Sequence, residues 1–161
     1  MLDNTIFTVT LLTALGSGLI GGIFFAFSTF IMTALKRIPP AHGMAAMQEI
    51  NVAVFNPWFG GAFFLTPLAC LVLAVAALLG WGDLDATYLL AGSTFYLVGS
   101  FLVTVAFNVP RNEALAKVNA DSREGVATWA HYVPSWTAWN HVRTAAALAA
   151  AAAFTFALVV D

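Results

Sequence analysis

Charge is what this sequence lacks most. Charged residues account for 9% of the 161-residue chain, whereas about 25% is usual for a soluble domain. The formal net charge is only −2, so long-range attraction to nucleic acid has no support. Hydrophobic residues make up 61% of the chain, a proportion typical of integral membrane proteins. The composition therefore predicts a membrane protein that does not bind nucleic acid.

Cysteine and cofactor motifs are equally scarce. Cys70 is the single cysteine, so it cannot form an internal disulfide, and we expect it to be a small buried hydrophobe. The sequence has no phosphate-binding glycine loop, no Gly-x-Ser-x-Gly and no dinucleotide fingerprint. No histidine has the three- or four-residue spacing of a helical metal motif. We expect no cofactor, and a metal or haem bound through His131 or His141 is the weaker alternative.

Long apolar stretches are abundant. Four of them reach the roughly 20 residues needed to cross a bilayer, and they cover about 6–35, 58–79, 87–107 and 138–160. They predict an all-α fold in which one membrane domain, residues 1–161, forms a four-helix bundle. The first stretch begins with Asp3 and ends in "LKRIPP", unlike a signal peptide, and we expect it to be a permanent span.

The two longer connections contain amphipathic segments. Met44, Met47 and Ile50 recur at helical spacing after a Pro-Pro pair, which predicts an interfacial helix. A second interfacial helix is predicted within "ADSREGVATWAHYVPSW", whose aromatic residues are typical membrane-interface anchors.

Basic residues fall on one side of the four-span arrangement. They are Lys36, Arg37, Arg111, Lys117, Arg123 and Arg143. The other side carries only acidic residues, namely Asp3, Asp83, Asp85 and Asp161. Because basic residues next to spans stay in the cytoplasm, we expect cytoplasmic long loops and both termini outside.

Small residues recur along the first span. Ala14, Gly18, Gly22 and Ala26 are each four positions apart, a spacing that allows another helix to approach closely. The alanine-rich fourth span is the expected partner of Gly18 and Gly22.

Polar residues concentrate where the fourth span begins. In "WTAWNHVRT" the residues Trp136, Trp139, Asn140 and Arg143 recur at three and four positions, so they form one stripe on a helix. His141 lies about 100° around the helix from Asn140. An arginine inside a span normally faces the bundle and has a partner. Glu49 and Glu113 are the carboxylates on that side of the membrane, although Arg143 could instead snorkel to the headgroups.

Other polar residues are expected at the same depth. Asn56 precedes the second span, and His131 and Tyr132 lie in the last long loop. Asn108 and Asn112 end the third span four positions apart. The two asparagines share a helix face if the helix continues past Pro110.

Four motifs resemble those of the anthrone-oxygenase-like family of small four-span membrane proteins. They are "NVPRNEAL" at 108–115, "WTAWNHVRTAAA" at 136–147, "FFAFSTFIMTAL" at 24–35 and "INVAVFNPWF" at 50–59. The resemblance covers essentially the whole chain. Family members with an assigned role oxidise an anthrone to an anthraquinone with O₂ in aromatic polyketide pathways. The resemblance implies that a shared site contains Asn108, Asn112, Trp136, Trp139, Asn140, His141 and Arg143.

Chemistry of that kind suits these residue types. An anthrone that loses a proton becomes an enolate-like anion, electron-rich enough to reduce O₂ without a flavin or a metal. A histidine can serve as the base, arginine and asparagine can bind the oxyanion, and tryptophan can stack on a fused ring.

Our first hypothesis is a cofactor-independent oxygenase that acts in the bilayer on a lipophilic phenolic or anthrone-like aromatic. His141 or His131 is the base, and Arg143 binds the oxyanion. The substrate-binding residues are Asn108, Asn112, Asn140, Trp136, Trp139, Tyr132 and Asn56. The alternative is a non-enzymatic bundle that binds a lipid, a quinone or a partner protein. Either reading is compatible with a homo-oligomer.

Overall fold

The computed structural model describes residues 4–80 and 84–160. These residues are almost entirely helical and contain no strand, so the all-α prediction is confirmed. The first helical run consists of α1 (Asn4–Ala26), the π-helix η1 (Phe27–Ile31) and α2 (Met32–Arg37). It is followed by α3 (Pro40–Ala53) and α4 (Pro57–Leu79). The next run contains α5 (Leu84–Thr94), η2 (Phe95–Leu102), η3 (Thr104–Asn108) and α6 (Val109–Ala116), and α7 (Arg123–Ala157) completes the chain.

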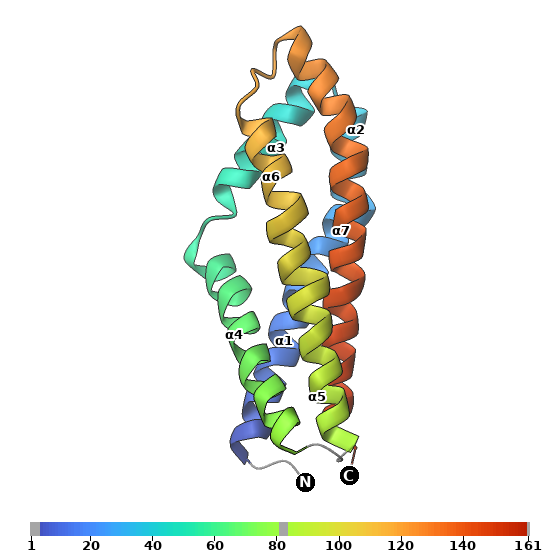
Figure 1. Ribbon diagram of the computed structural model, residues 1–161. Coiled ribbons are helices and arrows are strands. Elements are labelled where there is room, and N and C mark those ends of the chain that lie inside the picture. The colour runs from blue at the N-terminus through green and yellow to red at the C-terminus, as the bar shows by residue number, and fades with distance from the viewer. Residues whose placement is uncertain (1–3, 81–83, 161) are drawn as a thin grey trace.

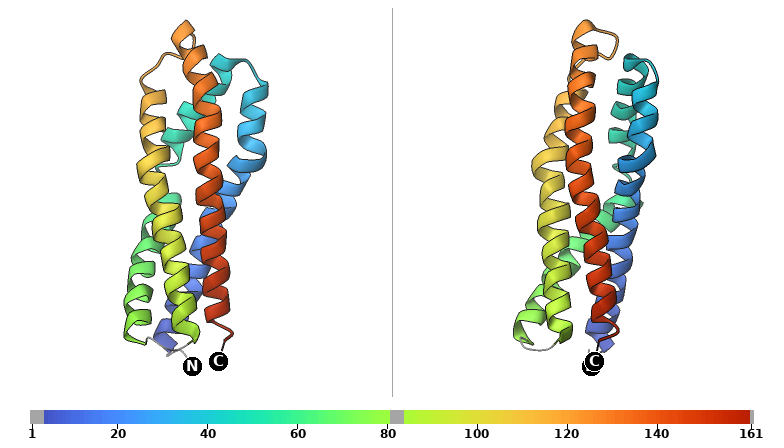
Figure 2. Two further views of the ribbon diagram at one scale, coloured as in Figure 1. Left: turned by 45° about the vertical axis from the view of Figure 1, so that its right-hand side comes forward. Right: turned by 90° about the vertical axis from the view of Figure 1, so that its right-hand side faces the viewer.

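The molecule is an elongated bundle with two different ends (Figure 1). α1, α4, α5 and the last part of α7 lie together at the end where the chain starts and finishes. α2, α3, α6 and the first part of α7 form the opposite end, which we call the polar end (Figure 2). α7 extends through both ends as one rod.

Within the described residues, three helical runs are long and apolar enough to cross a membrane. They are Asn4–Arg37, Pro57–Leu79 and Asp85–Ala116, and they make the chain consistent with an integral membrane protein. α7 is not among them, because it begins with polar residues and continues largely with alanine, which is only weakly apolar. A fourth span by α7 stays a prediction, as do the sides of the membrane. Asp3, Asp83 and Asp161, on which the orientation partly depends, lie outside the described residues.

α1 packs against α7 through small residues, but not through all of those expected. A Cβ added to Gly18 would lie 3.9 Å from the Ala151 Cβ. Gly22 is exposed, and a Cβ there would meet no heavy atom within 4 Å. The prediction for Gly22 is therefore wrong. Steps of four residues turn about 40° too far on a helix of 3.6 residues per turn, and the contact continues instead through Gly21, where a Cβ would lie 2.9 Å from Leu148 Cδ2.

The two long connections differ from each other. The first contains a helix, α3, whose Met44 and Met47 are buried against residues of α2 and α7. The second does not contain a separate interfacial helix, which corrects the prediction for that segment. Instead, residues from Arg123 onward belong to α7, and this helix continues through Pro134.

Two apolar clusters fill the two ends. The cluster at the chain-terminal end includes the fully buried Cys70, as expected, together with Leu73, Tyr96 and Phe154. The cluster at the polar end is built from larger and more polarisable side chains. Its members include Met32, Met44, Met47, Trp129, Tyr132 and Trp136. The polar side chains of the predicted stripe lie between the two clusters on α7.

Candidate functional site

Arg143 lies inside the bundle and is only 6% exposed. Its Nε donates to Asn140 Oδ1 at 2.9 Å, and its Nη1 donates to Thr104 Oγ1 at 3.3 Å. The guanidinium carbon lies 3.8 Å from the ring centroid of Phe24 and 5.0 Å from that of Trp136. Side chains from α1, η3 and α7 thus enclose one cation. We call Arg143 and these four neighbours the arginine cluster.

No carboxylate compensates this cation. Within residues 4–80 and 84–160, Arg143 forms no ion pair. Its Nη2 forms no hydrogen bond with these residues either. Glu49 and Glu113 are both exposed, so the prediction that one of them pairs with Arg143 is wrong. Burying a charge without a partner is costly, and two aromatic faces offset only part of that cost. The arrangement therefore has a strong electrostatic preference for an added anion.

Asn140 joins the cluster to the first helical run. Its Nδ2 donates to the Phe24 carbonyl at 2.8 Å and to Ser28 Oγ at 2.7 Å. Ser28 Oγ also lies 3.1 Å from Thr144 Oγ1. These contacts fix the Asn140 amide, so that its oxygen points toward Arg143 and can accept from Nε.

Asn112 holds two aromatic side chains of α7. Its Oδ1 accepts from Trp136 Nε1 at 2.7 Å and from the Tyr132 hydroxyl at 2.9 Å. Burial raises the pKa of the Tyr132 phenol, which keeps this group a neutral donor at physiological pH. Asn112 therefore sets the position of the indole that covers one side of Arg143.

Asn108 contacts the same part of α7. Its Nδ2 donates to the Trp136 carbonyl at 3.2 Å, whereas its Oδ1 is buried without a partner. Asn108 and Asn112 both reach Trp136 because the helix continues past Pro110, as the sequence predicted. The unpaired Oδ1 is a further unfilled hydrogen-bonding position near the cluster.

All three π-helical segments supply side chains to this region. Ser28 belongs to η1, and Thr104 and Asn108 belong to η3. η2 contributes Ser100, whose hydroxyl is buried without a partner. π-helical turns are rare and frequently occur at functional sites. The sequence analysis missed them, because the apolar pattern of these segments is the same as that of an ordinary span.

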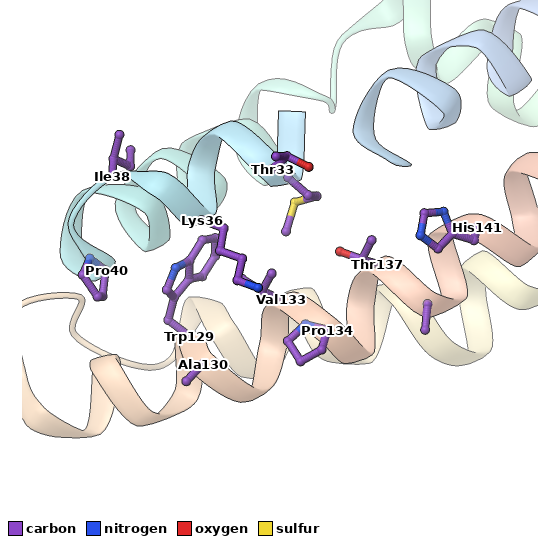
Figure 3. A pocket seen from close by; sticks show the side chains of 12 residues that line it. Thr33, Lys36, Ile38, Pro40, Trp129, Ala130, Val133, Pro134, Thr137 and His141 are labelled. Atoms are coloured by element: carbon purple, nitrogen blue, oxygen red, sulfur yellow. The ribbon is translucent and has the colours of Figure 1, made fainter. Parts of the chain in front are cut away.

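His141 lies on another side of α7. It is exposed and lines a groove of about 610 Å³ between α2 and the first half of α7 (Figure 3). Residues two positions apart on a helix are separated by about 200° around its axis. His141 and Arg143 therefore point in nearly opposite directions. The structure thus does not bring this histidine together with the cation.

Three other expected site residues also lie outside the cluster. His131 is exposed and lines a smaller groove of about 470 Å³ between α6 and α7. Trp139 stacks on Phe107, with ring centroids 3.6 Å apart and an interplanar angle of 6°. Asn56 is an exposed cap of α4, where its Oδ1 accepts from the Trp58 and Phe59 amides. Across 4–80 and 84–160, no three His, Cys, Asp or Glu side chains are grouped so that they could hold a metal ion.

The fold and the cluster define a helical membrane-type protein with an unpaired cation inside its bundle. The family model described as anthrone oxygenase matches residues 55–153, well over half of the 161 residues. The chain belongs to the anthrone oxygenase family, as the four sequence motifs indicated. The matched range includes Asn108, Asn112, Trp136, Asn140 and Arg143. No curated protein and no solved structure matches the chain.

Proposed function

We propose that this protein is a membrane-embedded oxygenase that oxidises a lipophilic phenolic or anthrone-like aromatic with O₂, without a cofactor. The observation that carries the proposal is the buried Arg143, which has no carboxylate partner among the described residues. Membership of the anthrone oxygenase family supports an oxygenase-like activity.

The reaction makes one demand that the cluster can meet. An anthrone CH₂ loses a proton to give an enolate whose negative charge rests largely on oxygen. Electrons then pass from this anion to O₂. One oxygen atom becomes the new carbonyl, and the other leaves as water with the two hydrogens of the CH₂ group. The protein has to stabilise the anion, and a guanidinium in a water-poor site does so strongly.

The arginine cluster suits a flat anion. The Phe24 and Trp136 rings lie beside the guanidinium, so a fused aromatic could stack there while its oxygen accepts from Nη2. Asn108 Oδ1, which has no partner, can accept from a phenol hydroxyl of the same molecule. Asn140 acts through Arg143, whose Nε it orients.

We assign the base to His141 ahead of His131, because His141 lies next to Asn140 and lines the larger groove. Since His141 and Arg143 face opposite sides of α7, the proposal has two successive substrate positions. The proton leaves in the groove, and the anion then passes the Ser28–Thr144 contact between η1 and α7 to reach Arg143.

The test is O₂ uptake with an anthrone by protein reconstituted in lipid nanodiscs. Arg143→Lys keeps the charge but loses the planar fork. We expect turnover to fall at least about tenfold, a loss of roughly 1.4 kcal/mol. Arg123 is an exposed residue at the start of α7. Arg123→Lys is therefore the matched control and should leave turnover unchanged. Unchanged turnover in Arg143→Lys would return Arg143 to an anchoring role. Wild-type protein that binds the anthrone but consumes no O₂ would support the non-enzymatic alternative.

A further inference from the structure

The groove between α2 and α7 has the dimensions of a small-molecule site. Its volume of about 610 Å³ falls within the range of about 300–1,000 Å³ that is usual for such sites. Its walls are mostly apolar, and the larger apolar residues are Met32, Ile38, Pro40, Trp129, Val133 and Pro134. A planar hydrophobic body can therefore bury much of its surface there.

Lys36, an exposed residue, gives the groove a positive charge at its edge. Its side chain extends from α2 toward Val133 of α7 (Figure 3). Lys36 forms no ion pair and no side-chain hydrogen bond within the described part of the chain. None of the residues that line the groove is an aspartate or a glutamate. An ammonium group beside an apolar wall can bind an anionic ligand through a charge-assisted hydrogen bond.

Thr137 lines the groove next to Val133 and His141. Its Oγ1 is buried and has no hydrogen-bond partner, which is uncommon for a buried hydroxyl. Thr137 is four residues before His141, so both lie on one face of α7 and both line the groove. The Thr137 side chain thus forms part of the groove wall, while its hydroxyl oxygen is shielded from the groove.

We propose that this groove binds a flat aromatic carboxylate. The carboxylate accepts from the Lys36 ammonium, and the ring system packs against Trp129 and Val133. The groove is also the first substrate position of the proposed function, so this inference rests on that function and deepens it by adding a carboxylate to the ligand, whose binding is tested without turnover. A two-chain phospholipid is a poorer occupant, because its chains exceed the groove and only its headgroup would reach Lys36.

The test compares two probes that differ in charge. Anthraquinone-2-carboxylate and its amide are titrated calorimetrically, without turnover, into wild-type protein in phosphatidylcholine nanodiscs. We expect the acid to bind at least about tenfold more tightly than the amide, the factor that corresponds to one charge-assisted contact of roughly 1.4 kcal/mol. Lys36→Gln should remove this preference and leave the affinity for the amide unchanged. Lys36→Arg should restore it.

Arg37→Gln is the matched control. Arg37 is the next residue, is exposed and does not line the groove, so this variant should keep the preference for the acid. Three results would overturn the proposal. They are an equal loss of acid affinity in Lys36→Gln and Arg37→Gln, a preference for the acid that survives Lys36→Gln, and no binding of either probe. Loss of amide binding in Lys36→Gln would indicate a damaged fold. The proposal is then tested with Lys36→Arg, which has to keep the preference for the acid. Displacement of the acid from wild-type protein by phosphatidylglycerol added to the phosphatidylcholine nanodiscs would assign the groove to a lipid headgroup instead.

Discussion

The two halves of α7 pack in contrasting ways. From Ala145 onward, the buried residues are Ala147, Ala150, Ala153, Phe154 and Ala157, and they contact other helices through apolar surface. Before Ala145, the buried residues include Trp136, Asn140, Arg143 and Thr144, and each takes part in a hydrogen bond. One continuous helix thus combines a close-packed apolar half with a half whose side chains bind to polar groups on its neighbours.

The difference follows from what each half leaves unsatisfied. Alanine and glycine allow backbones to approach closely and bury no polar atom, so the second half is complete as it stands. The first half buries a guanidinium, one amide and several hydroxyls, and the Thr137 hydroxyl among them has no hydrogen-bond partner. Buried hydroxyls without a partner also occur at the chain-terminal end, at Ser17, Ser93 and Tyr96 of the neighbouring helices, but none lies on the second half of α7 itself. Stability therefore depends mainly on the second half, and binding or catalysis on the first.

The largest expected effect comes from locking the first half. Ser28 Oγ and Thr144 Oγ1 are 3.1 Å apart, so a Ser28→Cys/Thr144→Cys pair should form a disulfide on mild oxidation. If the substrate must pass this contact to reach Arg143, oxidation should reduce turnover about 100-fold, or roughly 2.7 kcal/mol. O₂ uptake should recover on addition of reductant. The reduced double variant is the internal control, and full activity in the oxidised form would show that this contact does not open.

A smaller effect is expected from overpacking the second half. A Cβ on Gly21 would already lie 2.9 Å from Leu148 Cδ2, so Gly21→Leu should destabilise the protein by about 1–3 kcal/mol. Gly22→Leu is the control, since Gly22 is exposed with open space around it. The midpoint temperature of thermal unfolding in detergent should be lowered only in Gly21→Leu. Equal effects would mean that α1 is rotated relative to α7.

The smallest effect compares two threonines of α7. Thr144→Val loses a bond to the Asn140 carbonyl and the contact with Ser28, and should cost about 1 kcal/mol of stability. Thr155→Val loses only a bond to the Ala151 carbonyl at an exposed position, and should stay within about 0.5 kcal/mol. Chemical denaturation of both variants measures the difference. A larger cost for Thr155→Val would contradict the division between the two halves.

Helical spacing predicted most of the residues of α7 that share a face, although it also included Trp139, which stacks on Phe107 outside the cluster. Trp136, Asn140 and Arg143 were grouped correctly because their contacts depend on a local period of 3.6 residues. The same reasoning placed Asn108 and Asn112 on one face. Depth along the helix was a weaker guide, since His141 has the right depth but points away from Arg143.

Partners contributed by other helices could not be read from local spacing. Phe24 sits in an apolar run where nothing distinguishes it from its neighbours, yet it forms the closest aromatic contact with Arg143. Ser28 and Thr104 are mild polar residues that usually bond within their own helix. Their contacts depend on how distant segments pack and on the π-helical turns, and neither is encoded in a short sequence window.

Those π-helical turns also constrain chain length. Removing one residue from η3 (Thr104–Asn108) would turn everything that follows in that helix by about 100° and shift it by about 1.5 Å. Asn112 would then no longer face Trp136 and Tyr132, even though every side chain of the site was retained. In these segments the site therefore depends on the number of residues as well as on which residues they are. Insertions and deletions should therefore be tolerated in the connection between α6 and α7 far better than within η1 or η3.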